Sequence, residues 1–291
     1  MDIQERYKVL CPGFEAVTQI RPALRVNTLK INDKELILRL EKKKVTLEKI
    51  PYLSHGHWYA APFSLGATPE YLQGYYYLQE AASQLPAQVL HPQPGETVLD
   101  MSSAPGGKLT QLAAMMQNKG LLIGLDTDAK RLEATRNNCA RLGVTNAVLY
   151  VMDGRDAKKL GMTFDKILLD APCSGNYIVE KDYFKRRRMQ DFENRARLQK
   201  ELLKAAFSLL KPKGTLVYST CSLEPEEDEQ VVDWAVRELG AVVEPITLSI
   251  GDPGLIEVFG KKLNTTVANC KRFWPHKTGT QGFFVANLSR P

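Results

Sequence analysis

Two cysteines stand in short motifs that suit chemistry better than packing. Cys173 ends the run Asp-Ala-Pro-Cys at residues 170–173, and Cys221 lies inside the run Ser-Thr-Cys-Ser at residues 219–222. Each motif follows a short apolar segment, so both thiols are expected at the edge where buried strands end. A thiolate at such an edge can attack an electrophilic carbon, and the residues alone do not rank one thiol above the other. The remaining cysteines fit the ordinary role of a small buried apolar residue: Cys11, Cys139 and Cys270.

Four aspartates end or follow short apolar segments in the same part of the chain: Asp100, Asp126, Asp153 and Asp170. Any one of them could be a helix cap or a turn residue. Because the carboxyl ends of parallel strands meet at one edge of a sheet, we expect the four carboxylates to line one crevice. Asp126, after the second strand, is placed to accept hydrogen bonds from the two ribose hydroxyls of a nucleoside cofactor.

A glycine-rich turn follows the first of these aspartates. Residues 100–108 read Asp-Met-Ser-Ser-Ala-Pro-Gly-Gly-Lys, and the paired Gly106 and Gly107 let the backbone turn sharply and approach a ligand. The spacing matches neither the dinucleotide fingerprint G-x-G-x-x-G nor the phosphate-binding P-loop. The turn therefore indicates a nucleotide-like site, with an ordinary Gly-Gly turn as the alternative.

The elements that must position these residues alternate between strand and helix. Short β-branched runs predict buried parallel strands at residues 97–100, 121–126, 147–151, 166–170 and 214–218. Apolar residues at helical spacing predict helices over residues 130–142, 191–210 and 226–239. This alternation predicts an α/β fold with a doubly wound, mostly parallel sheet. Two late strands, at residues 241–246 and 282–288, have no convincing helix between them and predict an antiparallel pair at the sheet edge.

Residues 1–72 have a different pattern, which predicts a small α+β domain. The expected elements are a strand at residues 24–30, a helix at 33–42, and short strands at 45–50 and 58–63. Turn residues at 66–69 mark the boundary. A helix over residues 78–90 is expected to lead into the large domain, which spans residues 73–291.

The composition excludes several classes of protein. Of the 291 residues, 44% are hydrophobic and 25% are charged, which is the balance of a globular protein. No apolar stretch approaches the ~18 residues of a membrane span, and the first residues lack the pattern of a signal peptide. Five cysteines without CxxC spacing argue against a disulfide framework or a zinc site. We therefore expect a cytoplasmic, monomeric protein with no membrane anchor and no metal.

In their order and spacing, the motifs resemble those of the AdoMet-dependent RNA cytosine-5 methyltransferases, which modify tRNA and rRNA. The resemblance covers about residues 75–291 and rests on these segments: 79–83, 100–108, 170–173, 219–222 and 272–276. This chain departs from the family pattern at two places. Ser102-Ser103 replaces the usual Cys-Ala, and Asn176-Tyr177 replaces the Thr-Gly that usually follows the second motif. The second departure borders the target base and bears on the identity of the substrate.

The resemblance implies a class I, Rossmann-like methyltransferase domain with S-adenosyl-L-methionine (AdoMet) as the methyl donor. It implies that Cys221 attacks C6 of cytosine and that Cys173 assists the later elimination. Asp170 and Lys108 would lie beside the base. A thiolate suits this reaction, because C5 of cytosine is a poor nucleophile until C6 has been attacked. The implied AdoMet-binding residues are Ser102, Ser103, Ala104, Pro105, Gly106, Gly107, Lys108, Asp126, Arg131, Asp153 and Asp170.

A basic segment that also carries aromatic residues follows the Cys173 motif and is a candidate for RNA binding. Its cations are Lys181, Lys185, Arg186, Arg187 and Arg188. The alternative is a solvated helix face. Arg25 and the run Lys42-Lys43-Lys44 are a second candidate surface. RNA is the expected partner, tRNA ahead of rRNA, with an accessory protein as an optional source of specificity. The alternative functions are methylation of another RNA base or of DNA cytosine, and a non-catalytic RNA-binding scaffold.

Overall fold

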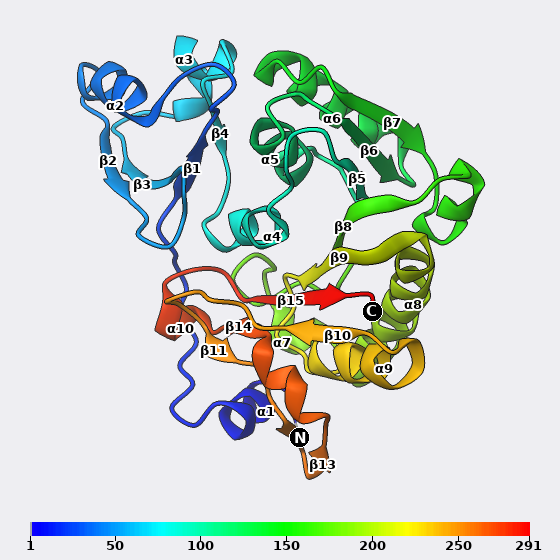
Figure 1. Cartoon of the computed structure of the whole chain (residues 1–291). Helices are drawn as coiled ribbons and strands as arrows, with labels where there is room; N and C mark the ends of the chain where they lie inside the picture. Colours follow the sequence, from blue (N-terminus) through cyan, green and yellow to red (C-terminus); the bar gives the residue numbers. More distant parts are fainter. Residues whose placement is uncertain (1) are drawn as a thin grey trace.

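The structure is a computed structural model that describes residues 2–291. Its main feature is a large mixed sheet in the order β11-β14-β15-β9-β8-β5-β6-β7, with β10 paired to β15 (Figure 1). The central strands are β5 (Thr97–Asp100), β6 (Leu121–Asp126), β7 (Ala147–Val151), β8 (Phe164–Asp170) and β9 (Leu210–Thr220). They pair with one another in parallel. The predicted doubly wound, mostly parallel sheet is confirmed.

Helices cover both faces of this sheet, because successive residues of a strand point to opposite sides. The helices are α4 (Leu85–Leu90), α5 (Gly107–Met115), α6 (Ala129–Leu142), α8 (Met189–Leu209) and α9 (Glu229–Leu239). Leu168 of β8 packs into the core with residues of α4, α5 and α6. Its neighbours Ile167 and Leu169 pack with α8 and α9 on the other face. The three helices predicted for this part of the chain are present, and the last begins at Glu229.

The C-terminal part of the chain adds antiparallel strands to one side of the sheet. β15 (Phe283–Ser289) pairs with β9 and with β10 (Val242–Glu244), so the predicted antiparallel pairing is confirmed, but its predicted place at the sheet edge is wrong because two more strands follow β15. Beyond them lie β14 (Lys271–Phe273) and β11 (Asp252–Pro253), which are too short for a period-2 pattern to reveal. A separate hairpin consists of β12 (Glu257–Val258) and β13 (Lys261–Lys262).

A small antiparallel sheet precedes the large one, in the order β2 (Thr46–Lys49), β3 (Gly56–Ala60), β1 (Ala23–Val26) and β4 (Tyr76–Leu78). Helix α2 (Asp33–Glu41) buries Leu36 and Leu40 in the core of this small sheet. The prediction of a continuous helix over residues 78–90 is wrong. Leu78 pairs with Leu24 in the small sheet, and α4 begins only at Leu85. The reason is that Pro86 fits the first turn of a helix but not its interior.

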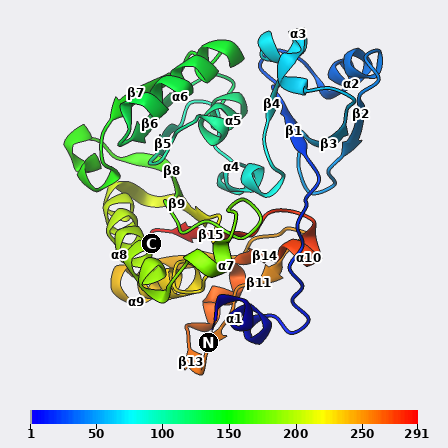
Figure 2. The ribbon, with the colours of Figure 1, turned by 180° about the vertical axis from the view of Figure 1, so that it is seen from behind.

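Two features bear on the predicted division at residue 72. Strand β4 lies beyond that residue and yet belongs to the small sheet. Helix α1 (Ile3–Leu10) lies before it and yet packs on the large domain, where Tyr7 meets Trp274 and Tyr183 of α7 (Tyr183–Arg186). Figure 2 shows α1 beside the C-terminal segments and away from the small sheet. The assignment of residues 1–72 as an RNA-binding domain and of 73–291 as the catalytic domain stays a prediction.

Short helices occupy several connections: η1 (Leu65–Ala67), α3 (Pro69–Leu72), η2 (Ala82–Gln84), η3 (Gly154–Leu160), η4 (Thr265–Asn269) and α10 (Pro275–Thr278). Within residues 2–291, no helix has the length and apolar character needed to span a membrane.

A buried arginine in β1 joins the small sheet to the glycine-rich turn and the helix after it through hydrogen bonds. Arg25 is 4% exposed, and its guanidinium donates to the Gly107 carbonyl at 2.6 Å and to Thr110 Oγ1 at 2.9 Å. Burial lowers the pKa of Arg25 to about 9. The expectation that Arg25 contacts RNA is therefore wrong, because its cation is enclosed and bonded inside the protein.

Gly74 lies where the small sheet meets α6, and the contact leaves no room for a side chain. Its φ is +75°, and an added Cβ would lie 2.0 Å from the Arg141 carbonyl oxygen. We expect Gly74→Ala to lower the free energy of unfolding by about 2–4 kcal/mol, from backbone strain and overpacking together. Gly95→Ala is the matched control, since φ is +96° there and no atom lies within 4 Å of the added Cβ. Its loss should be about 1 kcal/mol. Urea denaturation measures both, and equal losses would contradict this account of the junction.

Candidate active site

The two thiols meet at the carboxyl edge of the large sheet. Strands β8 and β9 pair in parallel with Asp170 opposite Ser219, and the chain continues from these residues to Cys173 and Cys221. The two Sγ atoms lie 2.9 Å apart, and both side chains are half-buried in the wall of a cavity of about 560 Å³. The hydrogen bond to Cys221, together with burial, raises the pKa of Cys173 well above its ordinary value. The structure thus brings both cysteines into one crevice, as their sequence positions predict.

An ion pair lies beside the thiols. Lys108 Nζ is 2.6 Å from Asp170 Oδ2, and Ser219 Oγ donates to Asp170 Oδ1 at 2.7 Å. Burial lowers the pKa of Lys108, but the carboxylate of Asp170 outweighs burial and the net shift is upward. Lys108 is therefore a cation at neutral pH. A negative charge on Cys221 also raises the pKa of Lys108, so this thiol lies close enough to interact electrostatically with the Lys108 ammonium.

The same cavity takes in most of the residues predicted to bind AdoMet. Those that line it are Ser102, Ala104, Asp126, Arg131, Asp153 and Asp170. A second cavity of about 290 Å³ shares three of these residues. It is also lined by Ser103, Pro105, Gly107, Lys108, Tyr77 and Glu80. Gly106 packs against α6 instead: its φ is +100°, and an added Cβ would lie 3.2 Å from Thr135. The glycine-rich turn thus borders two adjoining cavities rather than one.

The polar atoms around the turn suit a nucleoside that carries a charged amino acid tail. Asp126 is buried, and its carboxylate accepts hydrogen bonds from the backbone amides of Ala104 at 3.3 Å and Asp128 at 3.0 Å. Asp100 Oδ2 and Ser103 Oγ are buried and have no hydrogen-bond partner among residues 2–291. Carboxylate oxygens accept hydrogen bonds from ribose hydroxyls and from an ammonium group. The residues present therefore fit AdoMet.

Arg131 and Asp153 lie at the rim of the large cavity. Arg131 Nη2 donates to the Ala104 carbonyl at 3.1 Å, and Nη1 lies 3.6 Å from Asp126. Asp153 accepts hydrogen bonds from Arg155, which lower the pKa of Asp153 and keep it ionised. In the part of the chain that the structure describes, no group of three or more His, Cys, Asp or Glu side chains could hold a metal ion.

The predicted RNA-binding cations lie between the Cys173 turn and the start of α8. Lys181, Lys185, Arg186 and Arg188 are exposed, so their charges face the solvent. Arg187 is half-buried and forms an ion pair with Glu180. RNA contact by this segment stays a prediction. Arg187 is the least available of the five for such contact, because its guanidinium is already paired with Glu180.

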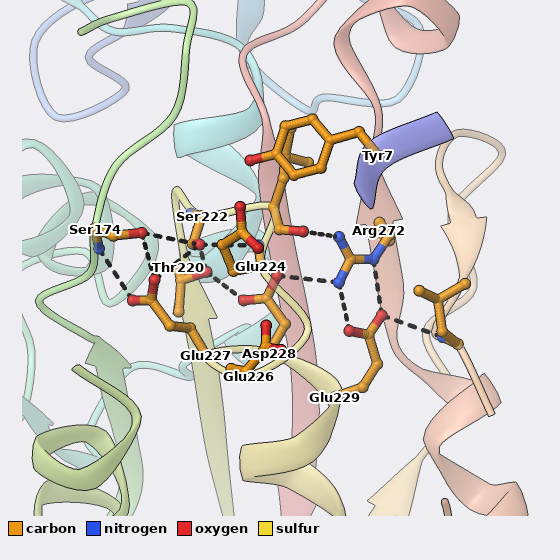
Figure 3. A network of polar contacts seen from close by, with 12 residues as sticks. Tyr7, Ser174, Thr220, Ser222, Glu224, Glu226, Glu227, Asp228, Glu229 and Arg272 are labelled. Carbon is orange, nitrogen blue, oxygen red and sulfur yellow. Dashed lines mark hydrogen bonds and ion pairs between the residues drawn. The ribbon is translucent and has the colours of Figure 1, made fainter. Parts of the chain in front are cut away.

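Sequence reasoning missed a buried polar network that lies against both thiol-bearing turns (Figure 3). Residues 224–229 read Glu-Pro-Glu-Glu-Asp-Glu, and the sequence pattern predicts only that a helix begins at residue 226. The fully buried carboxylates in this run are those of Glu224, Glu227, Asp228 and Glu229. They contact arginine, serine and threonine side chains. The available signal was the density of carboxylates directly after the Ser-Thr-Cys-Ser motif, because such a run needs partners if it is buried.

The fold and the glycine-rich turn define a class I methyltransferase, and solved structures agree. The crystal structure of a methyltransferase homolog from Pyrococcus horikoshii matches with a TM-score of 0.87 at 41% identity, covering 94% of this chain and 87% of that one. The structure of NSun6 from Pyrococcus horikoshii with SFG also matches with a TM-score of 0.87, at 28% identity, covering 99% of this chain and 97% of that one.

The chain belongs to the 16S rRNA methyltransferase RsmB/F family. The model of this family matches residues 87–289, and the model of the N-terminal domain of 16S rRNA methyltransferase RsmF matches residues 8–81. The family resemblance inferred from the motifs is confirmed.

Curated relatives with the same level of identity are named for different RNAs. The 28S rRNA (cytosine-C(5))-methyltransferase of Mus musculus is 39% identical over 291 residues, covering 95% of this chain and 36% of that protein. Ribosomal RNA small subunit methyltransferase F of Shewanella loihica is 39% identical, covering 93% of this chain and 57% of that protein. The tRNA (cytosine(49)-C(5))-methyltransferase of Pyrococcus abyssi is 39% identical over 279 residues, covering 94% of this chain and 89% of that protein. The chain thus spans only about a third to three fifths of the two rRNA relatives.

Asp100 should make the stability of the protein depend on pH. Burial raises its pKa to about 7, against about 4 in an unfolded chain. Between these values the folded state holds the extra proton, so stability falls as pH rises. Asp100→Asn removes this titration, and the amide can occupy the position of the unpartnered Oδ2. We expect the free energy of unfolding of the variant, relative to that of the wild type, to increase from pH 5 to pH 8 by on the order of a few kcal/mol. Urea denaturation without AdoMet tests this, and a difference independent of pH would contradict it.

Proposed function

We propose that this protein transfers a methyl group from AdoMet to C5 of a cytosine in RNA through a covalent cysteine–cytosine intermediate. The observation that carries the proposal is the pair of thiols 2.9 Å apart, in the cavity bordered by the glycine-rich turn. When bound, AdoMet supplies an electrophilic methyl group. The relatives from Mus musculus and Pyrococcus abyssi are named as cytosine-C5 methyltransferases of rRNA and tRNA, respectively, which supports the same reaction here.

Cys221 attacks C6 of the target cytosine, and the charges around the thiol pair favour it for this step. The ammonium of Lys108 attracts a thiolate at Cys221. The carboxylate of Glu227 acts on Cys173 instead and contributes to the raised pKa of that thiol. The Cys221 sulfur forms a bond to C6, and the displaced electron pair makes C5 nucleophilic. The base must leave its stack for this attack, which costs a few kcal/mol that RNA binding supplies.

Cys173 takes the C5 proton after methyl transfer. Its pKa is raised first by the hydrogen bond to Cys221 and in part by the charge of that thiol. Once Cys221 is bound to C6 as a thioether, both effects are gone, so Cys173 ionises more readily at the stage that needs a base. The C5 proton then goes to the Cys173 sulfur, the C5–C6 double bond forms again, and Cys221 leaves as a thiolate.

Asp170 and Lys108 hold the base between the two cavities. Asp170 lines both of them, so its carboxyl group reaches from the thiols to the glycine-rich turn. In its ion pair with Lys108 it is a hydrogen-bond acceptor, which suits the exocyclic amine of cytosine. The ammonium of Lys108 donates toward the ring as negative charge develops there.

The proposed substrate is tRNA, with rRNA as the alternative. This chain covers 89% of the tRNA methyltransferase of Pyrococcus abyssi, against 36% and 57% of the two rRNA relatives, which supports tRNA. The thiol pair favours cytosine C5 over another RNA base and favours an enzyme over a non-catalytic scaffold, because neither alternative needs two thiols in contact. A monomeric state, a cytoplasmic location and an accessory specificity protein stay predictions.

Single substitutions of the two thiols test the reaction. Without Cys221 the ring never becomes nucleophilic, so Cys221→Ala should abolish both methyl transfer and any covalent link to RNA. Cys173→Ala should transfer one methyl group and then fail to eliminate. It should accumulate as a protein–RNA adduct that survives denaturing electrophoresis, depends on AdoMet, and is absent from the double variant. An adduct in Cys221→Ala and none in Cys173→Ala would reverse the assignment. No adduct and no methylated cytosine with the wild type would contradict the function.

The exposed cations of α7 test the RNA surface. If Lys185 and Arg186 contact phosphates, the double variant Lys185→Ala, Arg186→Ala should bind RNA more weakly and flatten the salt dependence of log affinity by about 0.7 per lost contact. The control is Lys119→Ala, Lys213→Ala, because both lysines are exposed at the opposite edge of the sheet. Fluorescence titrations at several salt concentrations compare the two. Equal slopes in both double variants would assign the α7 cations to solvation.

A further inference from the structure

We propose that Glu227 is a positioning residue whose buried carboxylate holds the two thiol-bearing turns at their reacting separation. The inference rests on the proposed function, since it assigns how the thiols of that reaction are held. Glu227 lies in the turn before α9 and is fully buried. Figure 3 shows its carboxylate pointing toward Ser174 on one turn and Ser222 on the other.

The carboxylate joins the residues that directly follow the two cysteines in the chain. Ser174, after Cys173, donates its backbone N–H to Glu227 Oε2 at 3.0 Å and its hydroxyl to Oε1. Ser222, after Cys221, donates its hydroxyl to Oε1 at 3.1 Å. One oxygen of one side chain is thus shared by both turns. The strand register brings the turns together, Asn176 of the Cys173 turn donates to the Cys221 carbonyl at 2.8 Å, and Glu227 adds the carboxylate that both turns share.

Two further contacts keep Glu227 in place. The side-chain amide nitrogen of Gln199 in α8 donates hydrogen bonds to Glu227 Oε2 at 2.8 Å and to the Pro172 carbonyl at 3.1 Å. Gln199 therefore links the carboxylate to the residue before Cys173. The hydroxyl of Tyr218 donates to the Glu227 backbone carbonyl at 2.5 Å. Because Tyr218 is part of β9, the sheet itself fixes the backbone of Glu227.

The other buried carboxylates of the run have different partners. Those of Glu224 and Glu229 pair with Arg6 and Arg272, respectively. Asp228 accepts from the Thr220 hydroxyl at 2.6 Å, which supports only the Cys221 turn. Among the described residues, Glu227 is the carboxylate in this run that contacts both turns. This distinction separates a positioning role from a general contribution of the network to stability.

Glu227→Ala and Glu227→Gln separate position from charge. The alanine removes every contact to the turns and leaves the Ser174 N–H without its acceptor. In the glutamine, the amide oxygen can accept from Ser174 N–H and Gln199, while its amide nitrogen donates to the two hydroxyls, which can rotate to accept. Glu224→Gln is the matched control, because Glu224 is equally buried in the same network but its carboxylate pairs with Arg6.

The first readout is methylation kinetics. A displacement of about 1 Å can cost on the order of 100-fold in rate. We expect Glu227→Ala to lower kcat by that order while the KM for AdoMet stays close to wild type. Glu227→Gln should restore most of the rate, and Glu224→Gln should leave kcat unchanged. If Glu227→Ala does not fold, Ser174→Ala and Ser222→Ala each remove one contact, and each should give a smaller loss of kcat.

The second readout measures the separation of the thiols without RNA or AdoMet. Oxidised glutathione takes two electrons from Cys173 and Cys221, so that one intramolecular disulfide and two molecules of reduced glutathione form. The value of [GSH]²/[GSSG] at half-oxidation reports how close the two thiols are, and mass spectrometry of the 173–221 cross-linked peptide follows it. We expect this value to fall by about tenfold or more in Glu227→Ala, which corresponds to at least about 1.4 kcal/mol, and to stay near wild type in Glu227→Gln and Glu224→Gln.

The two readouts distinguish the two proposals. A wild-type half-oxidation value in a folded Glu227→Ala, or in both serine variants if that protein does not fold, overturns the positioning role whatever the kinetics show. A lowered value together with a lowered kcat supports it. If the wild-type protein methylates no RNA cytosine but the half-oxidation value still depends on Glu227, the positioning role stands and the proposed function fails.

Discussion

The parallel pairing of β8 with β9, in the register that sets Asp170 opposite Ser219, is the constraint on which the site depends. The chain leaves the two strands at the same edge of the sheet, and Cys173 and Cys221 follow within three residues. Ile167 to Leu169 and Leu216 to Tyr218 are buried between helices on both faces. A slip by one residue would turn every one of these side chains to the other face, so the core itself specifies the register. Hydrophobic packing below the thiols therefore brings the two turns to the same edge of the sheet.

The charges around the pair are divided between its two members. The ammonium of Lys108, paired with Asp170, interacts with Cys221, and the carboxylate of Glu227 helps to raise the pKa of Cys173. The raised pKa of Cys173 suits a thiol that acts as a base only after Cys221 has bound the ring. The cost is a set of buried carboxylates next to the site, and burial raises the pKa of Glu224 to about 7. Such groups reduce stability at neutral pH, as is common where a site needs fixed charge.

The sequence predicted the parts of the fold that rest on strong local patterns. The central strands and the helices between them follow from β-branched runs and helical spacing, and the convergence of Cys173 and Cys221 follows from their place after neighbouring strands. The sequence does not predict strand β4 and places its last residue, Leu78, in a helix, because a three-residue strand has too few positions to show alternation and is decided by pairing with β1. The sequence does not reveal that Arg25 is buried, because its partners, Gly107 and Thr110, lie more than 80 residues away in the chain. Glu227 escaped notice for the same reason, since its main partner, Ser174, comes from another strand end.

The central claim is that the two thiols have different duties and that Cys221 forms the bond to the base. Trapping of the wild-type protein on RNA that contains 5-fluorocytidine tests this directly, because a fluorine at C5 leaves no proton to remove and stops the reaction after methyl transfer. Digestion of the trapped complex and mass spectrometry then identify the cysteine attached to the base. The account predicts the peptide that carries Cys221. Attachment through Cys173 would contradict it.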